Sequence, residues 1–183
     1  MKIFQILLFS SVLLLTACGD NGSESNEFLI GAWDLEQLNG DGKVSTLKDG
    51  TTVESDIVAS SGEVSYVITF SEGSYVTAGS YDITNETIDA NTGTKIFEPL
   101  SYTNASGSGT YDINDNEITS GGAFIGVQIG GVNLGLMAGE QKSTIESLTA
   151  EELILLNTQE KSLTQGDSTV TVVLNTRSVW SKR

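Results

Sequence analysis

Short runs in which apolar and polar residues alternate fill the chain from Phe28 onward, and helical periodicity is almost absent. The clearest run covers residues 64–70, a turn follows at residues 71–74, and the alternation returns over residues 75–84. A side-chain period of two is typical of a β-strand with one buried face. Because strands joined by such short turns pair antiparallel, the pattern predicts an all-β domain built on an antiparallel sheet.

More hairpins are predicted towards the C-terminus. The triplet Asn114-Asp115-Asn116 tolerates the left-handed backbone of a tight turn, and it separates two short alternating runs. The remaining strands are expected at residues 153–156 and 169–174, and residues 175–180 can prolong the last strand. Eight to ten strands of this size are enough to close an up-and-down β-barrel, which removes the exposed edges of an open sheet.

One short helical element is expected between two of these strands. Thr149 and Glu152 have the spacing of a capping box, in which a threonine caps a helix and a glutamate follows three residues later. Only a few residues separate Leu148 from the apolar run at Leu153, so there is room for a single helical turn.

The uncharged segment of residues 121–139 contains seven glycines and allows two interpretations. Its glycine spacing fits packed membrane helices, but seven interior glycines each cost about 0.5–1 kcal/mol in a helix. A hairpin folded about Gly130-Gly131 is favoured because it pairs like with like. Its apolar face would hold Ile125, Val127, Ile129, Val132, Leu134 and Leu136. Its glycine-bearing face leaves space for a ring or a ligand.

The first residues are typical of a secretion signal. Residues 3–15 form an almost continuous apolar run after Met1 and Lys2, and this run is too short to span a bilayer. It ends in Leu15-Thr16-Ala17-Cys18, which resembles a bacterial lipobox. We therefore predict a lipoprotein signal peptide over residues 1–17 and lipidation of Cys18. The alternative is a plain signal peptide with a chance cysteine.

Behind the anchor, residues 18–27 are predicted to form a flexible tether and residues 28–183 the barrel domain. The tether carries no apolar side chain after the cysteine, so it has nothing to bury. The lipid chains at Cys18 would hold the protein on a membrane of a bacterial cell envelope. Residue 19 is Gly where an Asp resembles an inner-membrane retention signal, so the outer membrane is favoured.

Composition narrows the chemistry. The 183 residues include 24 Asp and Glu, 9 Lys and Arg, no His and one Cys. The absence of histidine and of paired cysteines removes the usual metal ligands, and a serine triad would lack its base. A formal charge of -15 disfavours nucleic acid. We predict no enzymatic activity, no catalytic residues, no cofactor and no metal site. A paired-carboxylate hydrolase is conceivable, but sequence spacing singles out no pair.

One run of residues has part of the spacing of a calcium-binding loop. The spacing of Asp112, Asn114 and Asn116 is similar to the start of such a loop, but the sixth position is Glu117 and the twelfth is Ala123, where the motif needs Gly and Glu. The run is therefore interpreted as turn chemistry.

Four short motifs are spread over residues 30–180. They are Gly31-Ala32-Trp33, Phe-Ser-x-Gly-x-Tyr at residues 70–75, Gly109-Thr110-Tyr111-Asp112-Ile113, and Ile145-Glu146-Ser147-Leu148-Thr149 ahead of Glu152-Leu153. Together they resemble the lipocalin-like domains of many bacterial lipoproteins. The resemblance implies that a basic side chain of the last strand, with Arg177 as the candidate, covers the Trp33 indole and closes one barrel end.

An eight-stranded barrel is wide enough inside for side chains or for one small ligand. We expect a small hydrophobic or amphipathic ligand in the interior, as a carrier in the envelope would bind. The expected wall is formed by Tyr66, Ile68, Phe70, Tyr75, Tyr81, Tyr111, Val172 and Leu174. The alternative is a structural module with a packed interior that docks an envelope protein on its outer surface. Large residues meeting across the centre would favour this alternative.

Overall fold

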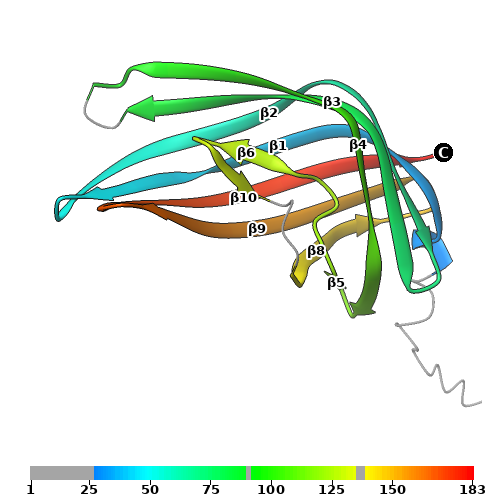
Figure 1. The fold of residues 1–183 in the computed structure, drawn as a ribbon. Helices are drawn as coiled ribbons and strands as arrows, with labels where there is room; N and C mark the ends of the chain where they lie inside the picture. The colour runs from blue at the N-terminus through cyan, green and yellow to red at the C-terminus, as the bar shows by residue number, and fades with distance from the viewer. Residues whose placement is uncertain (1–26, 90–91, 135–138) are drawn as a thin grey trace, which may run out of the picture.

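A computed structural model describes residues 27–89, 92–134 and 139–183 (Figure 1). Ten β-strands account for most of them. Their bounds are β1 Gly31–Lys48, β2 Thr51–Ser71, β3 Ser74–Asp89, β4 Lys95–Asn114, β5 Glu117–Ser120, β6 Val127–Ile129, β7 Val132–Leu134, β8 Gln141–Leu148, β9 Glu152–Gln165 and β10 Ser168–Lys182. The signal peptide and the tether predicted at residues 1–17 and 18–27 lie outside this range, except for Glu27.

Eight strands form one closed antiparallel ring in the order β1-β10-β9-β8-β5-β4-β3-β2. Neighbours in the ring are neighbours in sequence, apart from the seam between β1 and β10 and the step from β5 to β8. β6 and β7 form a separate two-stranded hairpin within that step. The predicted all-β class, the antiparallel pairing and the up-and-down order are therefore confirmed.

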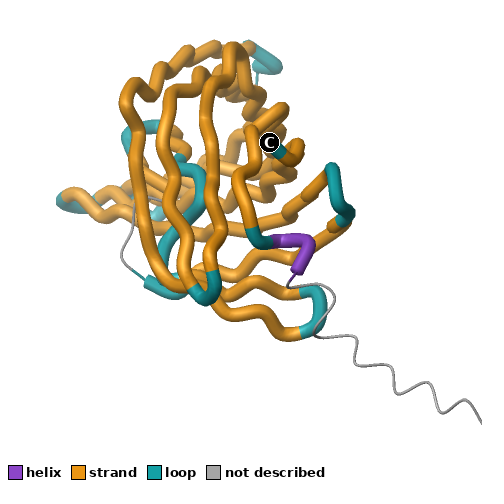
Figure 2. The backbone as a smooth tube through the Cα atoms, turned by 90° about the vertical axis from the view of Figure 1, so that its right-hand side faces the viewer, coloured by secondary structure: helices purple, strands orange, loops and turns teal. Residues whose placement is uncertain are grey.

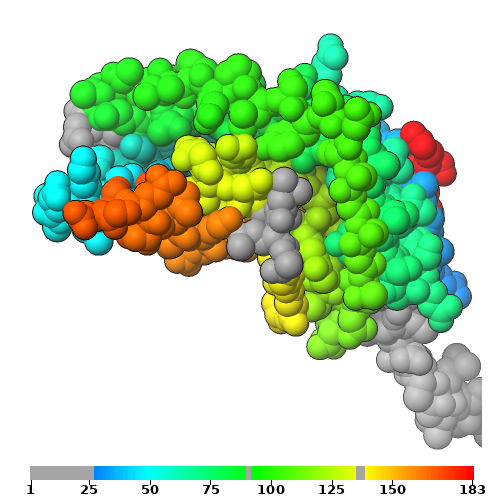
Figure 3. Space-filling view, viewed as in Figure 1, coloured from blue at the N-terminus to red at the C-terminus, as the bar shows by residue number. Residues whose placement is uncertain are grey.

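The ring is complete at only one end. β5 pairs with β4 at residues 111–114, and β8 pairs with β9 at residues 153–157, whereas β4 and β9 run on well past these partners. Among the described residues, the outer half of β4 pairs only with β3, and the outer half of β9 only with β10. The β6–β7 hairpin fills the space between these outer halves, and Figure 3 shows its yellow-green atoms between the green and the orange strands.

Strand parity separates an apolar interior from a polar exterior. The buried side chains of β2 and β10 recur at every second residue, as for Tyr66, Ile68 and Phe70 or for Val172 and Leu174. The residues between them, such as Val67, Thr69 and Val173, face outward and are only partly buried. Burial of the apolar set drives closure, because each fully buried large side chain contributes about 1.5–3 kcal/mol.

The predicted glycine hairpin is confirmed over residues 127–134. Val127 pairs with Leu134 and Ile129 with Val132, on either side of a turn in which Gly130 and Gly131 both have positive φ. These four apolar residues are buried, as the pattern predicted. Pairings expected beyond Leu134 fall on residues 135–138, outside the described range.

The turn predictions had mixed outcomes. The predicted turns after residues 70 and 113 are present, and Asp115 has the left-handed φ of +54° that a tight turn requires. The helical turn predicted at residues 149–152 is wrong, because the Thr149 hydroxyl accepts bonds from the amides of Glu151 and Glu152 and makes a bend. Figure 2 shows in purple the one helix of the described residues, residues 27–29. Within these residues no helix has the length and apolar character needed to span a bilayer.

Candidate functional site

A ladder of side-chain hydrogen bonds holds residues 122–128 inside the barrel. The carbonyl oxygens of alternate residues from 122 to 128 each accept a bond from a side chain of β2 or β3. The bonds are Tyr75 Oη to Gly122 O at 3.0 Å, Tyr66 Oη to Phe124 O at 2.9 Å, Tyr81 Oη to Gly126 O at 2.9 Å and Asn85 Nδ2 to Gln128 O at 2.7 Å. One row of donors on the inner wall therefore serves four acceptors that are two residues apart in sequence.

Two tyrosine hydroxyls, one of the ladder and one of β4, also accept hydrogen bonds from this segment. The Gly126 amide donates to Tyr81 Oη at 3.2 Å, and the Gln128 amide donates to Tyr102 Oη at 2.8 Å. The tyrosine side chains therefore replace the neighbouring strand that this segment lacks. Without them the buried carbonyls and amides would each lose a partner, at a cost of about 1–3 kcal/mol per group.

Aromatic contacts pack the same region tightly. The Phe124 ring meets Tyr75 edge-to-face at a centroid distance of 4.8 Å and Phe70 at 5.5 Å. Tyr81 stacks on Tyr102 at 4.7 Å and meets Tyr66 at 4.9 Å. Burial raises the pKa of Tyr81, with the neighbouring Tyr66 as the second cause, so its hydroxyl stays protonated and able to donate.

A glycine opposite Tyr75 makes room for its ring. Gly109 is its cross-strand partner, and a Cβ at Gly109 would lie 2.9 Å from the Tyr75 ring. The Gly122 carbonyl accepts the hydroxyl at the far end of the same ring. This strand glycine therefore leaves space for an aromatic ring.

All eight residues predicted to line a ligand cavity lie on the inner face and are buried. These residues are Tyr66, Ile68, Phe70, Tyr75, Tyr81, Tyr111, Val172 and Leu174. The structure brings them together around the chain's own hairpin, whose four apolar side chains belong to the same core. Tyr111 meets Phe70 edge-to-face at a centroid distance of 5.2 Å, and its hydroxyl donates to Ser71 O at 3.0 Å. Binding of a ligand by these residues stays a prediction.

The cation over Trp33 is Lys182, and the prediction that Arg177 takes this place was wrong. Lys182 Nζ lies 4.3 Å from the Trp33 ring centroid and donates to the carbonyls of Phe28 and Ile30. Trp33 and Lys182 are cross-strand partners, so they share the inner side of the barrel end. Arg177 has the opposite parity on β10 and pairs with Glu146 at 2.6 Å on the outside.

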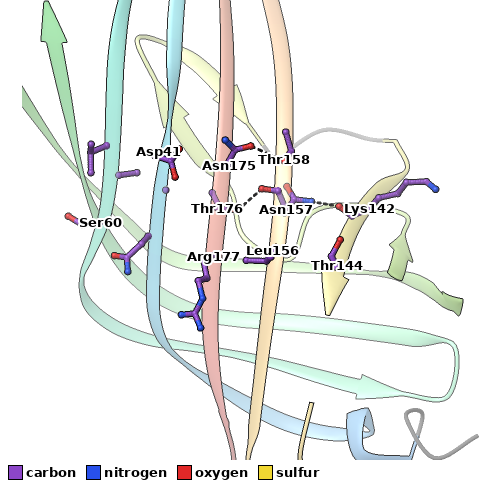
Figure 4. A pocket seen from close by; sticks show the side chains of 14 residues that line it. Asp41, Ser60, Lys142, Thr144, Leu156, Asn157, Thr158, Asn175, Thr176 and Arg177 are labelled. Carbon is purple, nitrogen blue, oxygen red and sulfur yellow. Dashed lines mark hydrogen bonds between the residues drawn. The ribbon is translucent and has the colours of Figure 1, made fainter. Parts of the chain in front are cut away.

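A groove of about 810 Å³ crosses the outer face of β2, β1, β10, β9 and β8 (Figure 4). Cross-strand registration builds its floor in rows. One row joins Val58, Asp41, Asn175 and Thr158. The next row joins Ser60, Asn39, Arg177, Leu156 and Thr144. A second hollow of about 680 Å³ continues it towards the β1–β2 tip and shares Asp41, Val58 and Asn175 with it.

Register shifts between paired strands lie at the edge of the groove nearer the closed end of the barrel. Pairing shifts occur between residues 34 and 39 of β1, between 61 and 64 of β2, and between 145 and 147 of β8. A β-bulge bends the strand that carries it and increases its twist. Bends at a common level turn the outer halves of the strands away from the closed end, which makes an otherwise convex outer wall concave.

The groove could not be predicted from the sequence. Its lining residues face outward, and several of them lie on strands without clear alternation of apolar and polar residues. Residues 39–61 include Gly40, Gly42 and several Ser and Asp residues, so the long β1–β2 hairpin has no strong pattern. The only available signal was the outward parity of residues 175 and 177 within the predicted last strand. That signal does not reveal which residues of β1, β2 and β9 lie beside them.

Comparisons with known proteins add little. No family model matches the chain, and no curated protein matches it. Among solved structures, the chain is similar to the crystal structure of Ail, the attachment invasion locus protein of Yersinia pestis. The identity is 8% and the TM-score 0.25, over 83% of this chain and 99% of that chain. A likeness of this size carries no argument about family, location or function.

Proposed function

We propose that this chain is a lipid-anchored protein of the bacterial cell envelope, without enzymatic activity, whose lipocalin-like barrel docks a protein partner on its outer groove. One observation carries the proposal: the chain's own hairpin occupies the interior where a carrier would hold its cargo. The ladder pairs the polar backbone of residues 122–128, and the hairpin's apolar face completes the core. The outer groove, in contrast, is open to an incoming chain.

The proposed envelope location rests on the sequence around Cys18. The described part of the chain begins beside Lys182, at the end of the barrel where Trp33 lies, which suggests how an anchored barrel would be oriented. With the anchor at that end, the long outer halves of β1, β2, β9 and β10 extend away from the lipid. The groove on these strands is then within reach of a partner, and the favoured membrane is the outer one.

Site-specific photo-crosslinking tests the docking proposal. A photoreactive residue replaces Val58, whose side chain lies in the groove and is 45% exposed, in cells that make the protein. The control position is Val76, 53% exposed on the outer face of β3. The proposal expects one discrete adduct from position 58, absent at position 76 and lost when Leu156→Asp changes the groove. No adduct, or the same adducts at both positions, would contradict it.

A carrier of a small hydrophobic ligand is the second candidate, and one observation favours it. At the strand tips beyond the hairpin turn, Val53, Ile96 and Leu163 share the inner parity of their strands but are 47%, 62% and 37% exposed. An apolar molecule could cover this rim. Native mass spectrometry of the unlipidated protein after incubation with an envelope lipid extract decides the matter, because a carrier must retain a bound mass.

A further inference from the structure

The outer groove keeps a negative charge after its ion pairs are counted. Lys43 pairs with Glu54 at 3.5 Å, Lys142 with Glu117 at 2.7 Å and Arg177 with Glu146 at 2.6 Å. All three cations line the groove or the second hollow. Each is paired with a carboxylate that lies outside the lining.

Asp41 is the carboxylate of the groove lining, and Asp56 lines the second hollow that continues the groove. They are exposed, and the ion pairs of the described residues leave both without a cation. The chain as a whole has a formal charge of -15, so the surrounding field has the same sign. A groove of one charge sign selects for the opposite sign in its occupant and speeds the encounter.

The shape of the groove fits an extended chain better than a compact molecule. Its floor crosses five strands, which at about 4.8 Å per strand spacing is about 19 Å. An extended polypeptide covers that length with about six residues. Small-molecule sites enclose most of their ligand, whereas Val58 and Leu156 on this floor are still 45% and 37% exposed.

The lining supplies what such a segment needs for binding. Val58 and Leu156 offer apolar contact on the two sides of the groove, and Asp41 lies beside Val58 in the same row. Hydroxyl and amide groups, such as those of Ser60 and Asn39, can bond the backbone of an extended chain. From this combination we infer that the partner contributes an extended, cationic polypeptide segment that alternates basic and apolar side chains. This inference rests on the proposed docking function.

A binding experiment with defined peptides tests the inference. The mature chain with Cys18→Ser is titrated into a labelled nine-residue peptide that alternates Lys and Val, and anisotropy is recorded at 50 and 200 mM NaCl. A peptide that alternates Glu and Val is the matched probe. The expected result is saturable binding of the cationic peptide alone, weakened by salt, because the attraction is electrostatic.

Two double variants locate the binding site. Asp41→Asn with Asp56→Asn removes two charges from the groove, while Glu98→Gln with Asp112→Asn removes two exposed charges elsewhere. The groove variant should weaken binding about tenfold or more and the control variant less than about twofold, because close charges dominate. Equal weakening by both variants would overturn the inference, since the peptide would then bind the acidic surface in general.

Failure of the inference can be told apart from failure of the docking proposal. If the cationic peptide does not bind but the crosslink from position 58 persists, the groove docks a partner of other chemistry and only the cationic segment is wrong. If neither binding nor a specific crosslink is found, the docking function fails as well.

Discussion

The interior and the outer groove use similar polar groups to different effect. Inside, the hydroxyls of Tyr66, Tyr75 and Tyr81 each donate to a carbonyl of the same chain, so the site is complete without a ligand. Outside, groove residues such as Thr158 and Asn175 bond mainly to each other and remain exposed to solvent. The same fold therefore contains one polar site that builds the core and another that faces solvent.

Truncation of a large side chain separates the two regions most strongly. Phe124→Ala removes a buried ring that packs on Phe70 and Tyr75, and it should lower the free energy of unfolding by about 3–5 kcal/mol. Leu156→Ala, on the partly exposed groove floor, should cost less than about 1 kcal/mol. Urea denaturation followed by tryptophan fluorescence measures both. Similar losses at the two positions would contradict the assignment of Phe124 to the core.

Removal of one ladder hydroxyl should have an intermediate effect. Tyr81→Phe leaves both the carbonyl and the amide of Gly126 without their partner, at an expected cost of about 1–3 kcal/mol. Hydrogen exchange at the Gly126 amide should accelerate by more than the global loss explains. The matched control is Tyr111→Phe, whose hydroxyl bonds outside the ladder and whose loss should leave exchange at Gly126 unchanged relative to stability.

Alkaline pH should weaken the interior before it affects the groove. Burial raises the pKa of Tyr66, Tyr75, Tyr81, Tyr102 and Tyr111 in the folded chain. Above the ordinary tyrosine pKa of about 10 the unfolded chain loses these protons first, so it binds fewer protons than the folded chain. Stability is then fully present below pH 10 and falls as the pH rises further.

Thermal unfolding between pH 8 and 11.5 checks this dependence. Burial lowers the pKa of Lys182, which acts in the opposite direction because the cost of burying its charge disappears as it deprotonates. One lysine opposes five tyrosines, so the net slope should be negative. A melting temperature that is constant up to pH 11.5 would show that the tyrosine hydroxyls are not held as the structure indicates.

Replacement of a single cation inside or outside the barrel should give the smallest difference in stability. Lys182→Met removes the cation over Trp33 and two backbone hydrogen bonds, and we expect a loss of about 1–2 kcal/mol. Arg177→Met breaks an exposed ion pair with Glu146 and should cost less than about 1 kcal/mol. Chemical denaturation at low and high salt distinguishes the pairs. A larger loss for Arg177→Met would contradict the position of Lys182 at the barrel end.

Sequence alone predicted the parts of the fold that repeat every second residue. Tyr66, Ile68 and Phe70 were assigned to the inner face, and the hairpin about Gly130-Gly131 was found from its paired apolar residues. What the hydroxyls do there was not predictable, because a tyrosine that faces a ligand and one that faces a carbonyl have the same pattern. Their acceptors are more than 40 residues away along the chain.

The wrong prediction of Arg177 as the residue over Trp33 shows a second limit of prediction from sequence. Both are basic residues of the last strand, and only their parity relative to Trp33 decides which one lies inside. The resemblance indicated that a cation covers the indole but not which residue supplies it. The groove was beyond reach for a related reason, since its floor depends on the register between strands that are distant in sequence.

The seam between β1 and β10 imposes an order on folding. Trp33 and Lys182 meet across it, and the amide of Arg183 bonds to the carbonyl of Ala32. The ring closes only when β10 pairs with both β1 and β9, and the partly folded chain carries two unpaired strand edges until then. A chaperone that shields such edges would be of most use to this protein in that interval.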